Sequence, residues 1–219
     1  MLLLLNDIVN LVTKKFNRVK IFDYEVGTTL WKRNDLIVCG RLIHSENCLS
    51  VKPYSKGIPK ILKFHEGLLN LNQKFLGDYH THVDYTQSWA SQFPSSCDLK
   101  APSVLGDYWP IENNSAIDID ITPQFQIIHS MVDGDFFLLT PKENRSKYAS
   151  INCQQRDIEA ICNEYYYHYM LIDNEYGDIE GSSNKLTSVV RQEISKINNI
   201  IGKRAIMRFY SNSQDEWIT

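Results

Sequence analysis

The chain has 219 residues, of which 43% are hydrophobic and 11% aromatic, and this is enough for one compact core of ordinary size. A formal net charge of −3 argues against a surface built for general nucleic-acid binding. The five cysteines form no Cys-x-x-Cys pair, which favours reduced thiols, and no apolar run is long enough to span a membrane as a helix. We therefore expect a protein without a nucleic-acid or membrane partner.

The N-terminal part of the chain predicts one helix followed by strands. Apolar residues between Leu4 and Phe16 recur at helical spacing and end at a basic turn, which is typical of an amphipathic helix rather than a signal peptide. We expect a protein that acts in the cytoplasm, or an effector that is secreted without an N-terminal signal peptide. Residues 24–30 and 36–39 are then predicted to form two strands joined by a polar turn.

The most informative motif is His80-Thr81-His82, which ends a predicted strand. Strand side chains alternate between two faces, so two histidines one residue apart point their rings to the same face. Asp98 follows after a loop and can reach the same point. Two imidazoles and one carboxylate leave the fourth tetrahedral position of a zinc ion open, as in catalytic zinc sites. His80, His82 and Asp98 therefore predict a catalytic zinc centre.

The segment that carries Asp98 also predicts the start of a helix. Ser95 is a favoured N-cap residue, and an acid three residues later is favourable at that position. Ser95 and Asp98 therefore have a structural interpretation as a capping box and a functional one as a ligand mount, and the two roles can coexist. Cys97 would need a different geometry to act as a ligand, so Asp98 is favoured.

Further along, the apolar runs 125–131 and 136–141 flank the sequence Val132-Asp133-Gly134-Asp135. Two such runs around Asp-Gly are a strong signal of a β-hairpin. We interpret His129, in the first run, as a structural histidine. The strand-like runs together predict an α/β (α+β) fold, with a mostly antiparallel central sheet that is flanked by helices.

The C-terminal part predicts amphipathic helices. Residues 156–170 are rich in aromatics with apolar positions at helical spacing, and residues 186–201 make a second apolar face that ends at Gly202. We expect two units: a catalytic core over residues 1–150 and a helical extension over residues 151–219. The tyrosines of the extension either pack on the sheet or bind a protein partner, since tyrosine is enriched at interfaces.

The motif His80-Thr81-His82 followed by Ser95-x-x-Asp98 resembles the metal motif of the JAMM/MPN zinc metalloproteases, a family that includes deubiquitinating isopeptidases. The forms GDYHTH and FPSSCD are most similar to the bacterial toxin- or effector-type branch. The resemblance covers residues 15–141 and departs from the family at Val83, where a proline is usual, and in a longer gap before the Ser-x-x-Asp element. The resemblance implies a cytidine-deaminase-like core, a Zn²⁺ cofactor and an oxyanion-binding role for Ser95.

The resemblance also implies an upstream glutamate as general base, because the attacking water must lose a proton. Glu25 fits this role, since residues 24–30 have the acid-x-Gly-x-x-Leu pattern of the corresponding strand in the family. Glu46 and Glu66 are the alternatives. Glu46 lies in a polar, turn-like run, and Glu66 lacks the second histidine at helical spacing that a HExxH zinc peptidase requires.

The activity that the resemblance implies is hydrolysis of a peptide or isopeptide bond in a protein or peptide substrate, with ubiquitin-like proteins among the candidates. The loop between Val83 and Pro94 would then contact the substrate through Tyr85, Trp89 and Phe93. Two alternatives stay open: a catalytically silent scaffold that binds protein partners, and a toxin-type zinc hydrolase that acts on a non-peptide amide. Silent members of the family lose metal ligands, whereas this chain has all of them.

Overall fold

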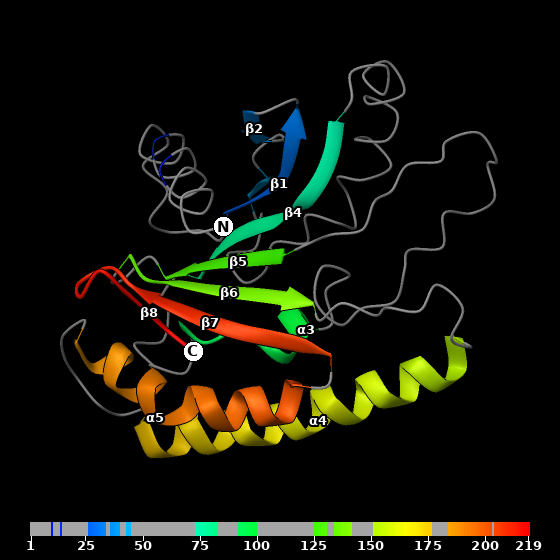
Figure 1. Ribbon diagram of the computed structural model, residues 1–219. Helices are drawn as coiled ribbons and strands as arrows, with labels where there is room; N and C mark the ends of the chain where they lie inside the picture. Colours follow the sequence, from blue (N-terminus) through cyan, green and yellow to red (C-terminus); the bar gives the residue numbers. More distant parts are fainter. Residues whose placement is uncertain are drawn as a thin grey trace.

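The computed structural model describes residues 10, 14, 26–33, 36–39, 43–44, 73–82, 92–99, 125–130, 134–141, 151–176, 184–202 and 204–219. Within these residues the chain forms a mixed sheet of eight strands and three helices, which is an α+β fold (Figure 1). The predicted N-terminal helix lies outside the described residues except for Asn10 and Lys14, which are both helical. Among the described helices, none is long and apolar enough to cross a membrane.

The sheet has the spatial order β2-β1-β4-β5-β6-β7-β8, and β3 also pairs with β1. Its strands are β1 Val26–Arg33, β2 Leu36–Cys39, β3 Ile43–His44, β4 Gln73–His82, β5 Phe125–Ser130, β6 Phe136–Pro141, β7 Ala205–Ser211 and β8 Glu216–Ile218. Strands β4 and β5 are parallel, and the other pairs are antiparallel. The predicted mostly antiparallel sheet is confirmed, and β4, with the two motif histidines, lies between β1 and β5.

The predicted hairpin is confirmed as the β5–β6 pair, in which His129 lies opposite Phe136. Its turn is closed by hydrogen bonds from the Ser130 amide to the Asp135 carbonyl (2.9 Å) and from the Gly134 amide to the Ser130 carbonyl (2.9 Å). Gly134 has a φ of 72°, a backbone conformation that residues with a Cβ rarely adopt. The glycine at this position therefore suits the turn.

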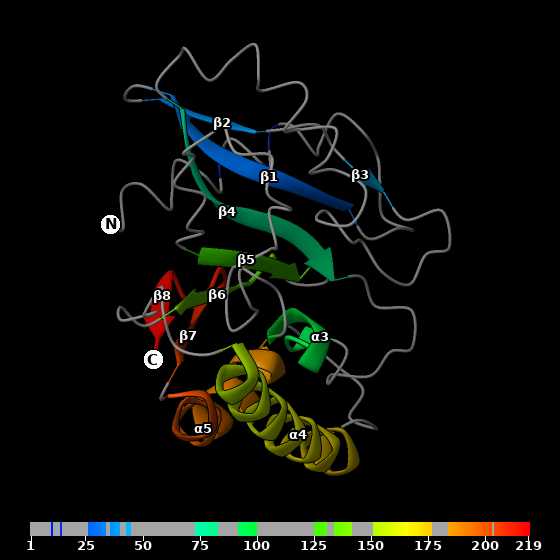
Figure 2. The ribbon, with the colours of Figure 1, turned by 90° about the vertical axis from the view of Figure 1, so that its right-hand side faces the viewer.

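The helices are α3 Ser96–Leu99, α4 Ile151–Tyr176 and α5 Asn184–Ile201. Helices α4 and α5 run antiparallel and side by side along one face of the sheet, and α3 lies on the same side (Figures 1 and 2). Both predicted C-terminal helices are therefore present, and α5 ends directly before Gly202, as its sequence indicated. A Cβ at Gly202 would collide with the carbonyl oxygen of Asn198, which explains the glycine at this helix end.

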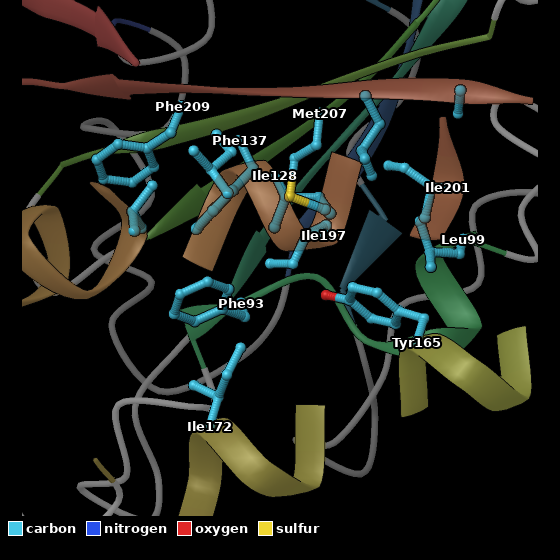
Figure 3. Packing of buried hydrophobic residues seen from close by; sticks show 14 of the residues in the cluster. Phe93, Leu99, Ile128, Phe137, Tyr165, Ile172, Ile197, Ile201, Met207 and Phe209 are labelled. Atoms are coloured by element: carbon cyan, nitrogen blue, oxygen red, sulfur yellow. The ribbon is translucent and has the colours of Figure 1, made fainter. Parts of the chain in front are cut away.

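The main hydrophobic core lies between these helices and the sheet. Figure 3 shows Phe137, Met207 and Phe209 from the sheet facing Ile172, Tyr165 and Ile197 from the helices. A second cluster covers the opposite face of the sheet and includes Leu30, Tyr79, Ile127 and Leu138. The strand period of two explains the division, because neighbouring residues such as Ile127 and Ile128 belong to different clusters.

The C-terminal segment also supplies two strands that the sequence analysis did not identify. Strand β7 pairs with β6 from Phe136–Tyr210 to Pro141–Ala205, and β8 pairs with β7 at the sheet edge. Burial alternates along Ala205–Ser211, which is the pattern of a strand with one face in the core. Residues 151–219 therefore share one sheet and one hydrophobic core with the strands that precede them.

Candidate metal centre

His80 and His82 lie near the end of β4 and are both buried. Their neighbour Tyr79 belongs to the cluster on the opposite face of the sheet. Because strand side chains alternate, the two imidazoles lie on the face that α3 and α4 cover. Their rings have centroids 5.1 Å apart, and their Nε2 atoms are separated by 3.2 Å. The prediction that the two rings converge is confirmed.

Asp98 is brought to these rings by the short helix α3. The Ser95 amide donates to Asp98 Oδ2 at 2.5 Å, and the Asp98 amide donates to Ser95 Oγ at 3.3 Å, which together form a capping box with aspartate in the acidic position. The Ser95 hydroxyl also donates to Asp98 Oδ2 at 2.7 Å. The cap thus fixes the carboxylate that faces the histidines, so the predicted capping role is confirmed and is compatible with a ligand role for Asp98.

The three side chains have the spacing of a metal-binding site. Asp98 Oδ1 lies 3.2 Å from His80 Nε2, and Asp98 Oδ2 lies 3.4 Å from His82 Nε2. A tetrahedral ion with ligands at about 2.0–2.1 Å separates any two of them by about 3.3 Å. The measured separations match this value, so His80, His82 and Asp98 can hold one metal ion.

The electrostatics of the cluster also suit a cation. Burial lowers the pKa of His80, but the carboxylates of Asp98 and Asp78 outweigh it and raise the pKa to about 10. Burial raises the pKa of Asp98, but the charge and hydrogen bonds of the two imidazoles hold it well below its usual range. The site therefore contains an ionised carboxylate that is balanced by a proton on His80. A metal ion would replace that proton, because a ligating imidazole must be neutral.

Asp78 is a carboxylate behind the ligands that sequence reasoning did not single out. It is fully buried, and it lies two residues before His80 on the same face of β4. Its Oδ2 atom lies 3.9 Å from His80 Nδ1, on the side of the ring opposite to Nε2. Histidines that bind metal usually direct their second nitrogen to such a group, which fixes the ring and its tautomer. The period of two that paired the histidines could also have identified Asp78.

The loop that leads to α3 is fixed to the rest of the protein at two points. The Ser130 hydroxyl donates to Gln92 Oε1 at 2.7 Å, and Ser130 is the β5 partner of His82. The Tyr165 hydroxyl on α4 donates to the Pro94 carbonyl at 2.5 Å. Burial, and then the negative charge of Asp98, raise the pKa of Tyr165 well above its usual value, so the phenol stays a donor. Sequence reasoning did not find these contacts.

Phe93 lies between the two anchor points, and its position corrects one prediction. Its side chain is 1% exposed and packs against Phe137, with ring centroids 5.3 Å apart. In Figure 3 it points into the core between α4 and the sheet. Phe93 therefore supports the loop from within the core and does not form a substrate-contacting surface, because an apolar residue before a site can equally serve packing.

The remaining predicted residues have different outcomes. Glu25, the alternatives Glu46 and Glu66, and the loop residues Tyr85 and Trp89 all lie outside the described residues. Cys97 is exposed and is not part of the ligand cluster.

His129 has the structural role that was predicted for it. Its Nδ1 atom shares a hydrogen bond of 2.5 Å with the Tyr79 hydroxyl, on the face of the sheet opposite to His80 and His82. Its ring also stacks on Phe136.

Comparison with known proteins gives no assignment: no family model matches the sequence, and no curated protein matches it. The candidate function therefore depends on the geometry of the site and on the motif.

Proposed function

We propose that the protein is a zinc-dependent hydrolase of peptide or isopeptide bonds, with the chemistry of the JAMM/MPN metalloproteases. The single observation that carries the proposal is the convergence of two histidine nitrogens and one carboxylate at the edge lengths of a zinc tetrahedron. Two imidazoles and a carboxylate are also the protein ligands of several known zinc peptidases, which keep the fourth position open.

Zinc suits this donor set better than the other common divalent ions. Magnesium and calcium prefer oxygen ligands in larger numbers, whereas imidazole nitrogens favour zinc and later transition metals. When bound, zinc supplies a Lewis acid that activates water and polarises a carbonyl group. His80, His82 and Asp98 would hold the ion, and Asp78 would orient the first of these rings from behind.

Glu25 is the proposed general base. It is the residue before Val26, which begins β1, and Gly27 in the same strand pairs with His80. A carboxylate in this position would accept the proton of the attacking water and return it to the leaving nitrogen.

Ser95 has two candidate roles that an experiment can separate. Its hydroxyl donates its one proton to Asp98, so it orients a ligand. By resemblance to the family it would donate to the developing oxyanion, which requires the hydroxyl to turn away from Asp98. If Ser95→Ala lowers the affinity for zinc, the orienting role dominates. If it lowers kcat while zinc affinity is unchanged, the hydroxyl acts on the oxyanion.

The metal assignment is tested by elemental analysis of purified protein. We expect about one zinc per chain in the wild type, because the three side chains are the protein ligands of one catalytic ion. His80→Ala and Asp98→Ala should lose the metal. Cys97→Ser is the matched control, since this exposed thiol is next to Asp98 but outside the cluster, and it should retain zinc. Full zinc content in both ligand variants would refute the assignment.

The hydrolase assignment is tested with fluorogenic peptide amides and with substrates in which a glycine carboxyl is joined to a lysine side chain. The wild type should cleave at least one class only when zinc is present. Glu25→Gln should keep the metal and lose turnover, because an amide cannot accept the proton. Wild-type turnover in Glu25→Gln would transfer the base to Glu46 or Glu66.

The proposal also covers the fold class, the branch of the family and the cellular location. We place the sheet in the cytidine-deaminase-like class of JAMM/MPN cores and the chain in the bacterial effector-type branch, acting in a cytoplasm. The support for this branch is the motif alone. The alternative of a silent scaffold is less favoured, because the ligand side chains are present and converge.

A further inference from the structure

The four clustered tyrosines of α4, Tyr165, Tyr166, Tyr167 and Tyr169, divide into two groups that the sequence could not separate. Tyr165 is buried in the main core, and Tyr169 packs against the same core. His168 also faces inward, and its Nε2 lies 2.9 Å from Glu193 of α5. Tyr166 and Tyr167 do not belong to this core and face solvent. Packing on the sheet therefore explains only half of the cluster.

The outward face of α4 carries an exposed apolar patch. Tyr167 is 70% exposed, Tyr166 53%, Leu171 48% and Met170 37%. In the part of the chain that the structure describes, the only other large apolar side chain with such exposure is Leu36 on β2. Because residues four apart are neighbours on a helix, Tyr166 lies beside Met170 and Tyr167 lies beside Leu171. These four side chains, the α4 patch, form one contiguous surface.

Acidic residues border the α4 patch at both ends. Glu159 and Glu164 precede it on the helix, and Asp173 and Glu175 follow it. Among the described side chains of α4, Arg156 is the one lysine or arginine, and it lies at the start of the helix. Residues 159–175 span about 24 Å at a rise of about 1.5 Å per residue. Over this length α4 itself combines aromatic and aliphatic side chains with acidic ones and has no lysine or arginine, although Lys196 of α5 interacts with Glu175 at one end.

We propose that the α4 patch is a docking surface for a lysine- or arginine-rich amphipathic segment of a partner protein. The apolar side of that segment would cover Tyr167, Leu171 and their neighbours, since tyrosine and methionine are enriched at interfaces. Its cationic side chains would reach the acidic borders and the faces of the two exposed tyrosine rings. The charge pattern selects this occupant. A second copy of the chain would bring acidic borders against each other, and an anionic membrane surface would be repelled.

The proposal is tested by fluorescence anisotropy with three labelled peptides of equal length that repeat Lys-Lys-Leu, Ser-Ser-Leu or Glu-Glu-Leu. The full-length wild type should bind the lysine peptide at least ten-fold more tightly than the other two, and added salt should weaken this binding. The double variant Tyr167→Ala/Leu171→Ala should bind it about ten-fold more weakly. The triple variant Glu159→Gln/Glu164→Gln/Glu175→Gln should lose the preference for lysine while it stays folded.

The matched control is Leu36→Ala, which removes an equally exposed apolar side chain from β2 and should bind like the wild type. Equal binding of the lysine and glutamate peptides, or unchanged binding by both patch variants, would overturn the proposal. A dimer in light scattering that Tyr167→Ala/Leu171→Ala dissociates would overturn it in favour of self-association. Binding to phosphatidylserine vesicles that the same variant abolishes would overturn it in favour of a membrane. None of these outcomes depends on zinc or on hydrolysis.

Discussion

Tyr165→Phe is the substitution that most directly tests how the C-terminal helices support the candidate metal centre. It removes only the hydroxyl that donates to the Pro94 carbonyl at 2.5 Å and keeps the ring that packs in the core. Pro94 is buried, so its carbonyl would lose a partner that water does not readily replace. A buried acceptor without its hydrogen bond costs about 1–3 kcal/mol.

The structure indicates how this cost would be distributed. If the loop stays in place, the free energy of unfolding falls by the full amount. If the loop moves so that water reaches Pro94, Ser95 and Asp98 move with it, and the cost is transferred to metal binding. Since about 1.4 kcal/mol corresponds to a ten-fold change in affinity, a loss of this size weakens zinc binding by about 5- to 150-fold. We expect about ten-fold, with a smaller loss of stability.

The assay is competition for zinc against a chromogenic chelator, together with urea unfolding of the same samples. Tyr176→Phe is the matched control, because Tyr176 on the same helix donates to Gln192 Oε1 at 2.9 Å in an exposed position far from the ligands. It should leave zinc affinity unchanged. If Tyr165→Phe also changes neither zinc affinity nor unfolding, the hydrogen bond to Pro94 does not position the ligand loop.

Three other predictions concern the sheet. Asp78→Asn should lower zinc affinity by about 10–100-fold while the protein stays folded, because it removes the negative charge 3.9 Å behind His80 Nδ1; unchanged affinity in the chelator assay would exclude a role for this charge. Gly77→Ala should destabilise the protein by about 1–3 kcal/mol in urea unfolding, since a Cβ there collides with the Phe125 carbonyl across the parallel strand pair. Burial lowers the pKa of His129 to about 4. As the pH falls, this histidine therefore becomes protonated in the unfolded chain before it does so in the folded protein. Stability should therefore fall by about 3 kcal/mol between pH 6.5 and 4, and His129→Leu should remove that part of the pH dependence.

Local patterns in the sequence determined much of the site. The strand period of two was sufficient to place His80 and His82 on one face, and the capping rule placed Asp98 on a helical turn. The same rules predicted the β5–β6 hairpin and the two long helices, because each depends on residues that are close together in the chain. Asp78 was within reach of this reasoning as well, since it shares the strand face of the histidines.

Only the tertiary structure decided which distant segments support the ligands. The Tyr165 hydroxyl and the Pro94 carbonyl are 71 residues apart, and no local pattern relates them. Phe93 illustrates the same limit, because an apolar residue beside a site can face substrate or core and only packing against Phe137 settles which. Likewise, the four tyrosines within residues 165–169 of α4 are the same residue type, but two of them pack in the core and two face solvent. Periodicity gives the face of an element, whereas the partner of that face depends on long-range packing of the whole chain.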